Sequence, residues 1–375
     1  MASIFVCGDI IHHVDKDSFI GEQLSKTIQE ADFSIGNLEG VELYDEAKRH
    51  GPVQLPGTIE YLHNVGFDMM LLANNHITDQ GLNLYQDTVA KLKKYHLSYI
   101  GAGTSWEEVY DFRHIERIDD INFGFVNVCE AQVGHFTEQK QSFGYAWMGT
   151  PSLMDGIKSI AKKTDFVIVF VHAGLEHYNI PLPEIRSFYQ QLCDAGASCV
   201  IGGHPHCVQG YEVYKNSFIA YSLGNFYYPH PGGEYPEENN AFSLMLNFEK
   251  GQPVKVRTIH HCLENNVVEE VSPEQSSINE SGLCEILGSH YEEEAEKMCI
   301  KAYDNICRRL LEEALCGEKE EQTFVEQLKN IMHRTVFRKR YITATKKYRD
   351  ALLLRLFENE SYRYTIIRAI KAKQK

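Results

Sequence analysis

The chain has 375 residues, of which 43% are hydrophobic and 24% are charged, and this composition is typical of a globular protein. Its formal net charge is −15, so general nucleic-acid binding is not expected, because phosphates need cationic partners. The ten cysteines include no Cys-x-x-Cys pair, which argues against a thiolate zinc site and favours a reducing compartment.

The N-terminal residues Met-Ala-Ser-Ile-Phe-Val-Cys-Gly-Asp enter a predicted strand directly, which leaves no room for a signal peptide. No run of about twenty apolar residues occurs, so no transmembrane helix is expected. These two features predict a cytoplasmic protein, which could still bind peripherally to a membrane.

Short apolar runs alternate with helical patterns from residue 1 to roughly residue 260. The predicted strands are 4–7, 69–73, 98–100, 122–128, 166–171 and 198–201, and the predicted helices are 18–31, 58–65, 82–95, 153–162 and 183–195. Later apolar runs at 217–221, 242–248 and 254–260 lack intervening helices and indicate antiparallel or mixed additions. The order predicts a layered α/β fold with mixed central β-sheets.

The character of the chain changes after about residue 275. Gly and Pro become rare, and the spacing of apolar residues is typical of helices. A polar stretch at 265–280 separates the two parts. We therefore predict an α/β domain over residues 1–265 and an α-helical C-terminal region over residues 280–375 that ends in a basic tail.

The basic tail, residues 333–375, contains thirteen Lys and Arg residues and three acidic residues, interspersed with leucines and isoleucines. Three interpretations remain open. The tail could form a helix that packs one face on the body and leaves its cations in solvent. It could instead lie on an anionic membrane surface, or attract a polyanion such as polyglutamate or a teichoic-type polymer.

Polar side chains follow several predicted strands. In chain order they are Asp9, Glu39, Asn75, His172, His204 and His206. Each has a structural alternative when taken alone: Asp9 could stand in a turn, Asn75 in a helix cap and His172 in the core. Because binding sites in open α/β sheets form at the carboxyl ends of strands, their joint occurrence predicts a metal site. Two irregular segments, 129–149 and 229–240, could border it.

These residue types suit divalent metals. A pair of ions needs a bridging carboxylate and further ligands from several strands. Imidazole and carboxylate ligands together suit Mn, Zn or Fe. The sequence therefore predicts one or two divalent ions of unknown identity.

Taken together, these residues and their neighbours resemble the CapA family of bacterial capsule and poly-γ-glutamate synthesis proteins, which has the calcineurin-like metallophosphatase fold. The segments that carry the resemblance are 8–9, 37–39, 73–81, 172–178, 201–206 and 221–226. It extends from residue 4 to about residue 260.

The resemblance implies a role for each residue. Asp9 and His206 would hold one metal ion, Glu39 would bridge, and Asn75, His172 and His204 would hold the second ion. His76 would act as general acid or charge stabiliser, oriented by Asp79, and Glu176 and Asn225 would line the site.

The chain departs from the metallophosphatase pattern at one point. The pattern usually has Asp-x-His at the end of the first strand, whereas Asp9 is followed by Ile10 and Ile11. His12 or His13 would have to substitute for the missing ligand. The first metal position is therefore expected to be weak, or the protein uses one ion.

Two functions follow from the resemblance. The first is a metal-dependent hydrolase that acts on a phosphoester or a γ-glutamyl-type amide, in a polymer or a small molecule, during capsule, poly-γ-glutamate or cell-surface polymer biosynthesis. The alternative is a non-catalytic subunit of the same fold that binds an anionic polymer or a synthase partner. The ligand set favours the enzyme, and the missing histidine favours the binding subunit.

Overall fold

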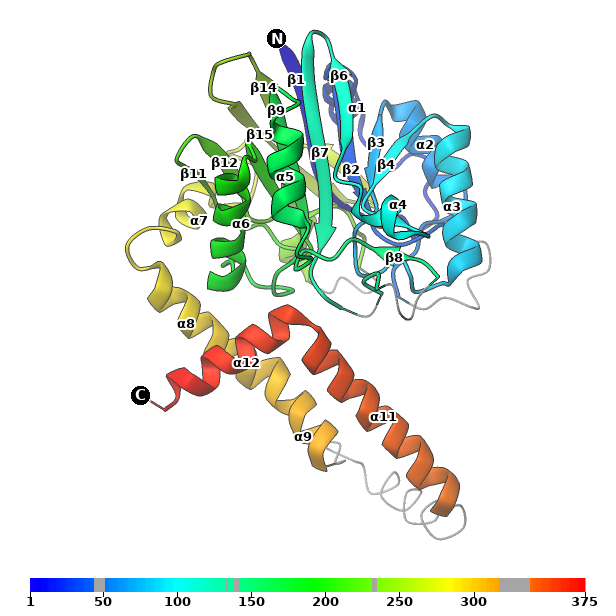
Figure 1. Cartoon of the computed structure of the whole chain (residues 1–375), viewed down its shortest axis with the longest axis vertical. Coiled ribbons are helices and arrows are strands. Elements are labelled where there is room, and N and C mark those ends of the chain that lie inside the picture. Colours follow the sequence, from blue (N-terminus) through cyan, green and yellow to red (C-terminus); the bar gives the residue numbers. More distant parts are fainter. Residues whose placement is uncertain (44–50, 133, 138–141, 231–234, 317–337, 375) are drawn as a thin grey trace. The chain divides into compact units, whose positions relative to one another are not determined.

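The computed structural model describes residues 1–43, 51–132, 134–137, 142–230, 235–316 and 338–374. These residues form two compact units, Met1–Tyr291 and Glu292–Lys375, each of which is described by itself (Figure 1). The domain bounds 1–265 and 280–375 stay a prediction.

The first sheet of the larger unit is mixed. Its strands are β1 (Ala2–Ile10), β2 (Phe33–Leu38), β3 (Met69–Leu71), β4 (Ser98–Ile100), β13 (Asn225–Tyr227), β14 (Asn240–Phe248), β15 (Lys255–Glu264) and β16 (Val267–Glu270). They are arranged in the order β16-β15-β14-β1-β2-β3-β4, and β13 also pairs with β1. Strand β1 runs parallel to β2 and β13 and antiparallel to β14. The predicted additions at 242–248 and 254–260 thus extend the parallel part of this sheet, whereas the one at 217–221 falls in the second sheet.

The second sheet has parallel strands at its centre. Its members are β6 (His114–Ile118), β7 (Ile121–Cys129), β9 (Phe166–His172), β10 (Cys199–Gly203), β11 (Tyr211–Tyr214) and β12 (Ser217–Ala220), in the order β11-β12-β10-β9-β7-β6. Strands β7, β9, β10 and β12 are parallel to their neighbours in this series. A separate two-stranded antiparallel sheet pairs β5 (Ala102–Gly103) with β8 (Gly144–Tyr145).

The two sheets share one core. Ile4 and Val6 of the first sheet belong to the same buried cluster as Phe123, Phe125 and Phe170 of the second. Since both faces of these central strands are covered, their sequences are almost continuously apolar instead of alternating.

Helices cover the outer faces of the sheets (Figure 1). The helices α1 (Glu22–Gln29), α2 (Thr58–Val65) and α3 (Leu82–Lys94) contribute to the core on the first sheet, and α5 (Leu153–Ala161) and α6 (Pro183–Ala195) pack on the second. The short elements α4 (Trp106–Tyr110), η3 (Pro236–Asn239) and α7 (Glu280–Ile286) lie in connecting segments. The predicted layered α/β fold with mixed sheets is confirmed.

The C-terminal part of the chain is helical, as predicted. Its elements are α8 (Tyr291–Ala302), the π-helical turn η4 (Tyr303–Cys307), α9 (Arg308–Cys316), α11 (Arg338–Glu358) and α12 (Glu360–Ala372). Asn359 caps α12 by accepting a hydrogen bond from the amide of Tyr362 at 2.8 Å. Among the described residues, no helix is long and apolar enough to cross a membrane. Residues 333–337 of the basic tail lie outside the described residues.

Candidate metal centre

The parallel register of the strands brings the predicted ligands together. Asp9 of β1 pairs with Asn37 of β2, and the next turn of chain carries Glu39. In the other sheet, His172 ends β9 beside Gly203, which ends β10 directly before His204. One expectation is corrected: Asp9 lies inside β1, which continues to Ile10 through an irregularity in its pairing with β2 and β13. Such irregularities redirect side chains.

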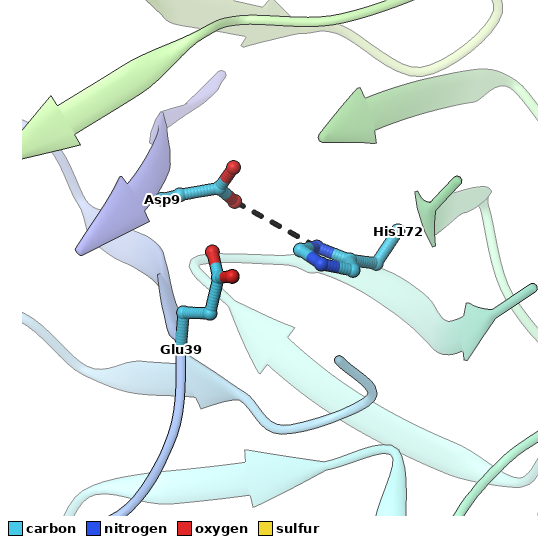
Figure 2. Close-up of side chains that lie close together, drawn as sticks. All are labelled: Asp9, Glu39 and His172. Atoms are coloured by element: carbon cyan, nitrogen blue, oxygen red, sulfur yellow. Dashed lines mark ion pairs between the residues drawn. The ribbon is translucent and has the colours of Figure 1, made fainter. Parts of the chain in front are cut away.

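Three of these side chains form a compact buried cluster. Asp9, Glu39 and His172 each offer a ligand atom, and these atoms all lie within 4.8 Å of one another. Figure 2 shows the three side chains converging from separate chain segments on one space. The dashed line drawn there joins Asp9 Oδ1 to His172 Nδ1, which lie 3.7 Å apart.

Glu39 has an unusual environment for a carboxylate. It is fully buried, and among the described residues neither of its oxygens has a hydrogen-bond partner. Burial raises its pKa well above the usual value, and the nearby carboxylates of Asp9, Glu176 and Asp79 raise it further. Because a buried carboxylate without partners is strongly destabilising, the environment fits a bound cation.

The predicted second set of ligands also converges. Asn75 Oδ1 lies 2.9 Å from His172 Nε2, which lies 3.2 Å from His204 Nδ1. Burial lowers the pKa of His172 well below its usual value, and it lowers the pKa of His204 to about 3. Both imidazoles are therefore neutral at physiological pH, the state in which they bind metals.

Asp9 is held in place by Asn37 on β2 and by two histidines of the segment that follows β10. Its Oδ1 accepts a hydrogen bond from Asn37 Nδ2 at 2.7 Å, and its Oδ2 accepts one from the backbone amide of His204 at 3.2 Å. His206 Nδ1 lies 3.5 Å from the same Oδ2. Burial raises the pKa of Asp9, against the opposing effect of His206 and Asn37. The aspartate is thus oriented by groups that belong to the candidate centre or adjoin it.

The backbone around the histidines is strained. His204 and His206 have φ angles of 94° and 61°, in the left-handed region that non-glycine residues seldom adopt. Such conformations cost on the order of 1–3 kcal/mol each and cluster at functional sites. The strain is consistent with a segment shaped to direct both imidazoles inward.

His76 lies between the buried centre and solvent. Its Nδ1 is 2.7 Å from Asp79 Oδ2, and its Nε2 is 3.8 Å from Glu39 Oε1. The side chain is 23% exposed. This position would let His76 contact both the centre and an approaching substrate, as a general acid must.

Two of the three residues predicted to line the site lie beside a predicted ligand, and the third does not. Glu176 Oε1 lies 3.8 Å from His204 Nε2, and Asn225 Oδ1 lies 2.9 Å from His206 Nδ1. His12 instead lies 2.8 Å from Thr58 Oγ1 and packs on Phe19 with ring centroids 4.4 Å apart. Among the described contacts of His12, none reaches a predicted ligand.

Several polar neighbours of the centre were not predicted. Glu130 Oε1 lies 3.7 Å from His204 Nε2, and Gln132 Nε2 lies 3.1 Å from the same nitrogen. Glu130 follows β7, so the pattern of polar residues at strand ends would have identified it. Asn37 stands inside a segment that carried the resemblance. Glu238, in the second irregular segment, has no sequence signal beyond its place in a loop.

The fold and the centre define a layered α/β protein with a candidate metal site at the carboxyl ends of its strands. Residues 3–230 match the family described as bacterial capsule synthesis protein PGA_cap, and the match covers more than half of the chain. The chain belongs to this family, and the resemblance to CapA proteins is confirmed.

Two relatives carry the CapA name. The chain is 27% identical over 271 residues to the capsule biosynthesis protein CapA of Bacillus anthracis, and the match covers 66% of each chain. It is 26% identical over 201 residues to the PGA biosynthesis protein CapA of Bacillus subtilis (strain 168), over 52% of this chain and 53% of that one. The chain thus spans only part of the length of both relatives.

Solved structures of other proteins are similar at low identity. A 5′-nucleotidase precursor from Thermus thermophilus has 13% identity and a TM-score of 0.43, over 82% of this chain and 59% of its own. A hypothetical protein from the same organism has 16% identity and a TM-score of 0.44, over 69% and 98%. Vps29 from Chaetomium thermophilum has 10% identity and a TM-score of 0.28, over 72% and 94%.

Proposed function

We propose that the chain is a metal-dependent hydrolase whose centre is organised around Glu39. The observation that carries the proposal is the environment of this carboxylate, which is fully buried and has no hydrogen-bond partner for either oxygen among the described residues. A bound divalent cation would compensate the buried charge.

The superfamily roles, carried over to these residues, give the proposed ligands. Asp9 and His206 would hold one ion, Glu39 would bridge, and Asn75, His172 and His204 would hold a second. Carboxylate, imidazole and amide oxygen together suit Mn, Zn or Fe. When bound, such ions supply a hydroxide nucleophile at neutral pH and polarise the electrophile.

The chain's own residues would complete the chemistry. Asp79 accepts a hydrogen bond from His76 Nδ1, which orients the ring. Nε2 faces the NH₂ of Asn75 at 3.1 Å, so only a doubly protonated His76 ring would offer an Nε2 proton to the leaving group.

The names of the relatives support the substrate class. One is described as a capsule biosynthesis protein and another as a PGA biosynthesis protein. A phosphoester or a γ-glutamyl-type amide, in a cell-surface polymer such as poly-γ-glutamate or in a small molecule, is therefore the proposed substrate.

The alternative is a non-catalytic subunit that binds an anionic polymer or a synthase partner. One observation favours it. Ile11, which stands where the superfamily has its first-strand histidine, is fully buried and offers no ligand atom. A centre short of one ligand would bind its first ion weakly.

Metal analysis of the purified protein, combined with hydrolysis assays, tests the proposal. We expect bound Mn, Zn or Fe and turnover of bis-p-nitrophenyl phosphate or γ-glutamyl p-nitroanilide. His204→Ala should lose both, while the matched control His114→Ala, on β6 beside Glu116, should keep both. Bound metal without turnover would favour the binding subunit. If neither metal nor turnover appears under Mn, Zn and Fe supplementation, the hydrolase proposal is wrong.

A further inference from the structure

A second buried carboxylate lies next to the candidate metal centre. Glu238, in η3, has a side chain that is 1% exposed, and three donors surround it. His177 Nδ1 lies 2.5 Å from its Oε1, while His230 Nε2 and Asn225 Nδ2 lie 3.0 and 3.3 Å from its Oε2. In contrast to Glu39, this carboxylate is fully satisfied by protein groups.

The surroundings keep Glu238 ionised. Burial alone would raise its pKa, but hydrogen bonds from His177 and His230 outweigh burial and lower the pKa to about 2. An ionised carboxylate can only accept hydrogen bonds. The group that Asn225 presents to Glu238 must therefore be its NH₂.

The orientation of the Asn225 amide in turn determines which nitrogen of His206 carries the proton. With its NH₂ directed at Glu238, the amide presents its carbonyl oxygen in the other direction, 2.9 Å from His206 Nδ1. Because a carbonyl oxygen only accepts, Nδ1 must carry the proton. The carboxylate of Asp9, 3.5 Å from the same nitrogen, favours the same tautomer.

The fixed tautomer leaves one nitrogen of His206 free to act as a ligand. In the neutral ring with this tautomer, Nε2 has an unprotonated lone pair, and it lies 4.0 Å from Glu39 Oε1. The ring is also confined by Tyr228, whose centroid is 5.6 Å away. His206 would accordingly bind an ion through Nε2.

We propose that Glu238 is a positioning residue, which acts through Asn225 to hold His206 in the Nδ1-protonated tautomer with Nε2 directed at the centre. The metal role of His206 rests on the proposed function, whereas the tautomer does not. Groups that orient a ligating histidine in this way typically contribute about 10–100-fold to metal affinity.

Long-range ¹H–¹⁵N NMR of histidine-labelled, metal-free protein tests the tautomer directly, with His206 assigned by comparison with His206→Gln. We expect the wild type to carry the proton on Nδ1. Asn225→Leu removes both bonds of the amide and should give a mixture of tautomers. The control His114→Asn instead replaces a histidine whose Nε2 lies 2.9 Å from Glu116 on β6, outside the network of Glu238 and Asn225. It should leave His206 unchanged.

Manganese binding, measured by isothermal titration calorimetry, gives the second readout. Asn225→Leu should weaken it about 10–100-fold, and His114→Asn should change it less than about 3-fold. A wild-type His206 protonated on Nε2 would overturn the proposal, whether or not the variant folds. So would an Asn225→Leu variant with the wild-type tautomer. If the wild type binds no manganese but shows the expected tautomer, the metal function fails and the positioning role stands.

Discussion

Replacing Glu39 by glutamine should stabilise the metal-free protein at neutral pH. The pKa of Glu39 in the folded chain is raised well above its ordinary value of 4.5, chiefly by burial. The folded state therefore holds a proton that the unfolded chain releases. The stability linked to this group is fully present below pH 4.5 and is lost as the pH rises towards the folded pKa. The amide of the Glu39→Gln variant does not titrate, so this pH-dependent loss of folding stability is absent from the variant.

The size of this stability loss follows from the same linkage between proton binding and folding. Each pH unit above 4.5 removes about 1.4 kcal/mol for as long as the folded group stays protonated. At pH 7 the loss therefore reaches about 3 kcal/mol at most, and Glu39→Gln should recover about 1–3 kcal/mol. Saturating metal should reverse the order, because an ion at 1,000 times its Kd stabilises the wild type by about 4.1 kcal/mol.

Urea unfolding followed by tryptophan fluorescence is a suitable assay. Both tryptophans, Trp106 and Trp147, lie in the larger unit, so the signal reports the unit that contains Glu39. The experiment compares pH 4.5 with pH 7 in the presence of a chelator. Glu116→Gln is the matched control, since the hydrogen bond from His114 lowers the pKa of Glu116 and its replacement should destabilise slightly.

The outcome that would refute this reasoning is specific. If chelated Glu39→Gln is no more stable than the wild type at pH 7, Glu39 has a partner that compensates its charge without metal. A gain that is the same at pH 4.5 and pH 7 would also contradict the titration argument.

Three further predictions concern other parts of the chain. His76→Gln should lower kcat for the hydrolysed substrate about 10²–10⁴-fold with unchanged metal content, and an unaltered kcat would exclude its role as general acid. Gly8→Ala places a Cβ 1.9 Å from the carbonyl oxygen of Gly224, so urea unfolding should show a loss of about 1–3 kcal/mol, and full stability would contradict the tight packing. The membrane interpretation of the basic tail predicts that vesicles with anionic lipid sediment the full chain but not a chain without residues 333–375; equal pelleting would exclude it.

The sequence predicted that Asp9, Glu39 and His172 lie close together because strand ends are local features. Asp9, Glu39 and His172 each follow or end a short apolar run, and parallel strands place such positions at one edge. The apolar runs also predicted the strands themselves. They could not assign strands to two different sheets, since a strand buried on both faces has the same composition in either sheet.

The surroundings of the ligands could not be predicted in the same way. Glu238 and Asn37 contact the ligands or their neighbours only because the folded chain brings distant segments together. A single carboxylate in a Pro- and Glu-rich loop has no periodicity or spacing that distinguishes it from a solvated charge. The continuation of β1 to Ile10 depends on an irregular pairing that apolar patterns do not encode.

The most direct test of the central claim is anomalous X-ray scattering from crystals of the full chain grown with manganese. A metal centre organised around Glu39 predicts an anomalous peak within bonding distance of its carboxylate and bordered by Asp9 and His172. Crystals of Glu39→Gln should lose or weaken this peak. A wild-type crystal grown with saturating manganese that shows no anomalous peak beside Glu39 would contradict the account.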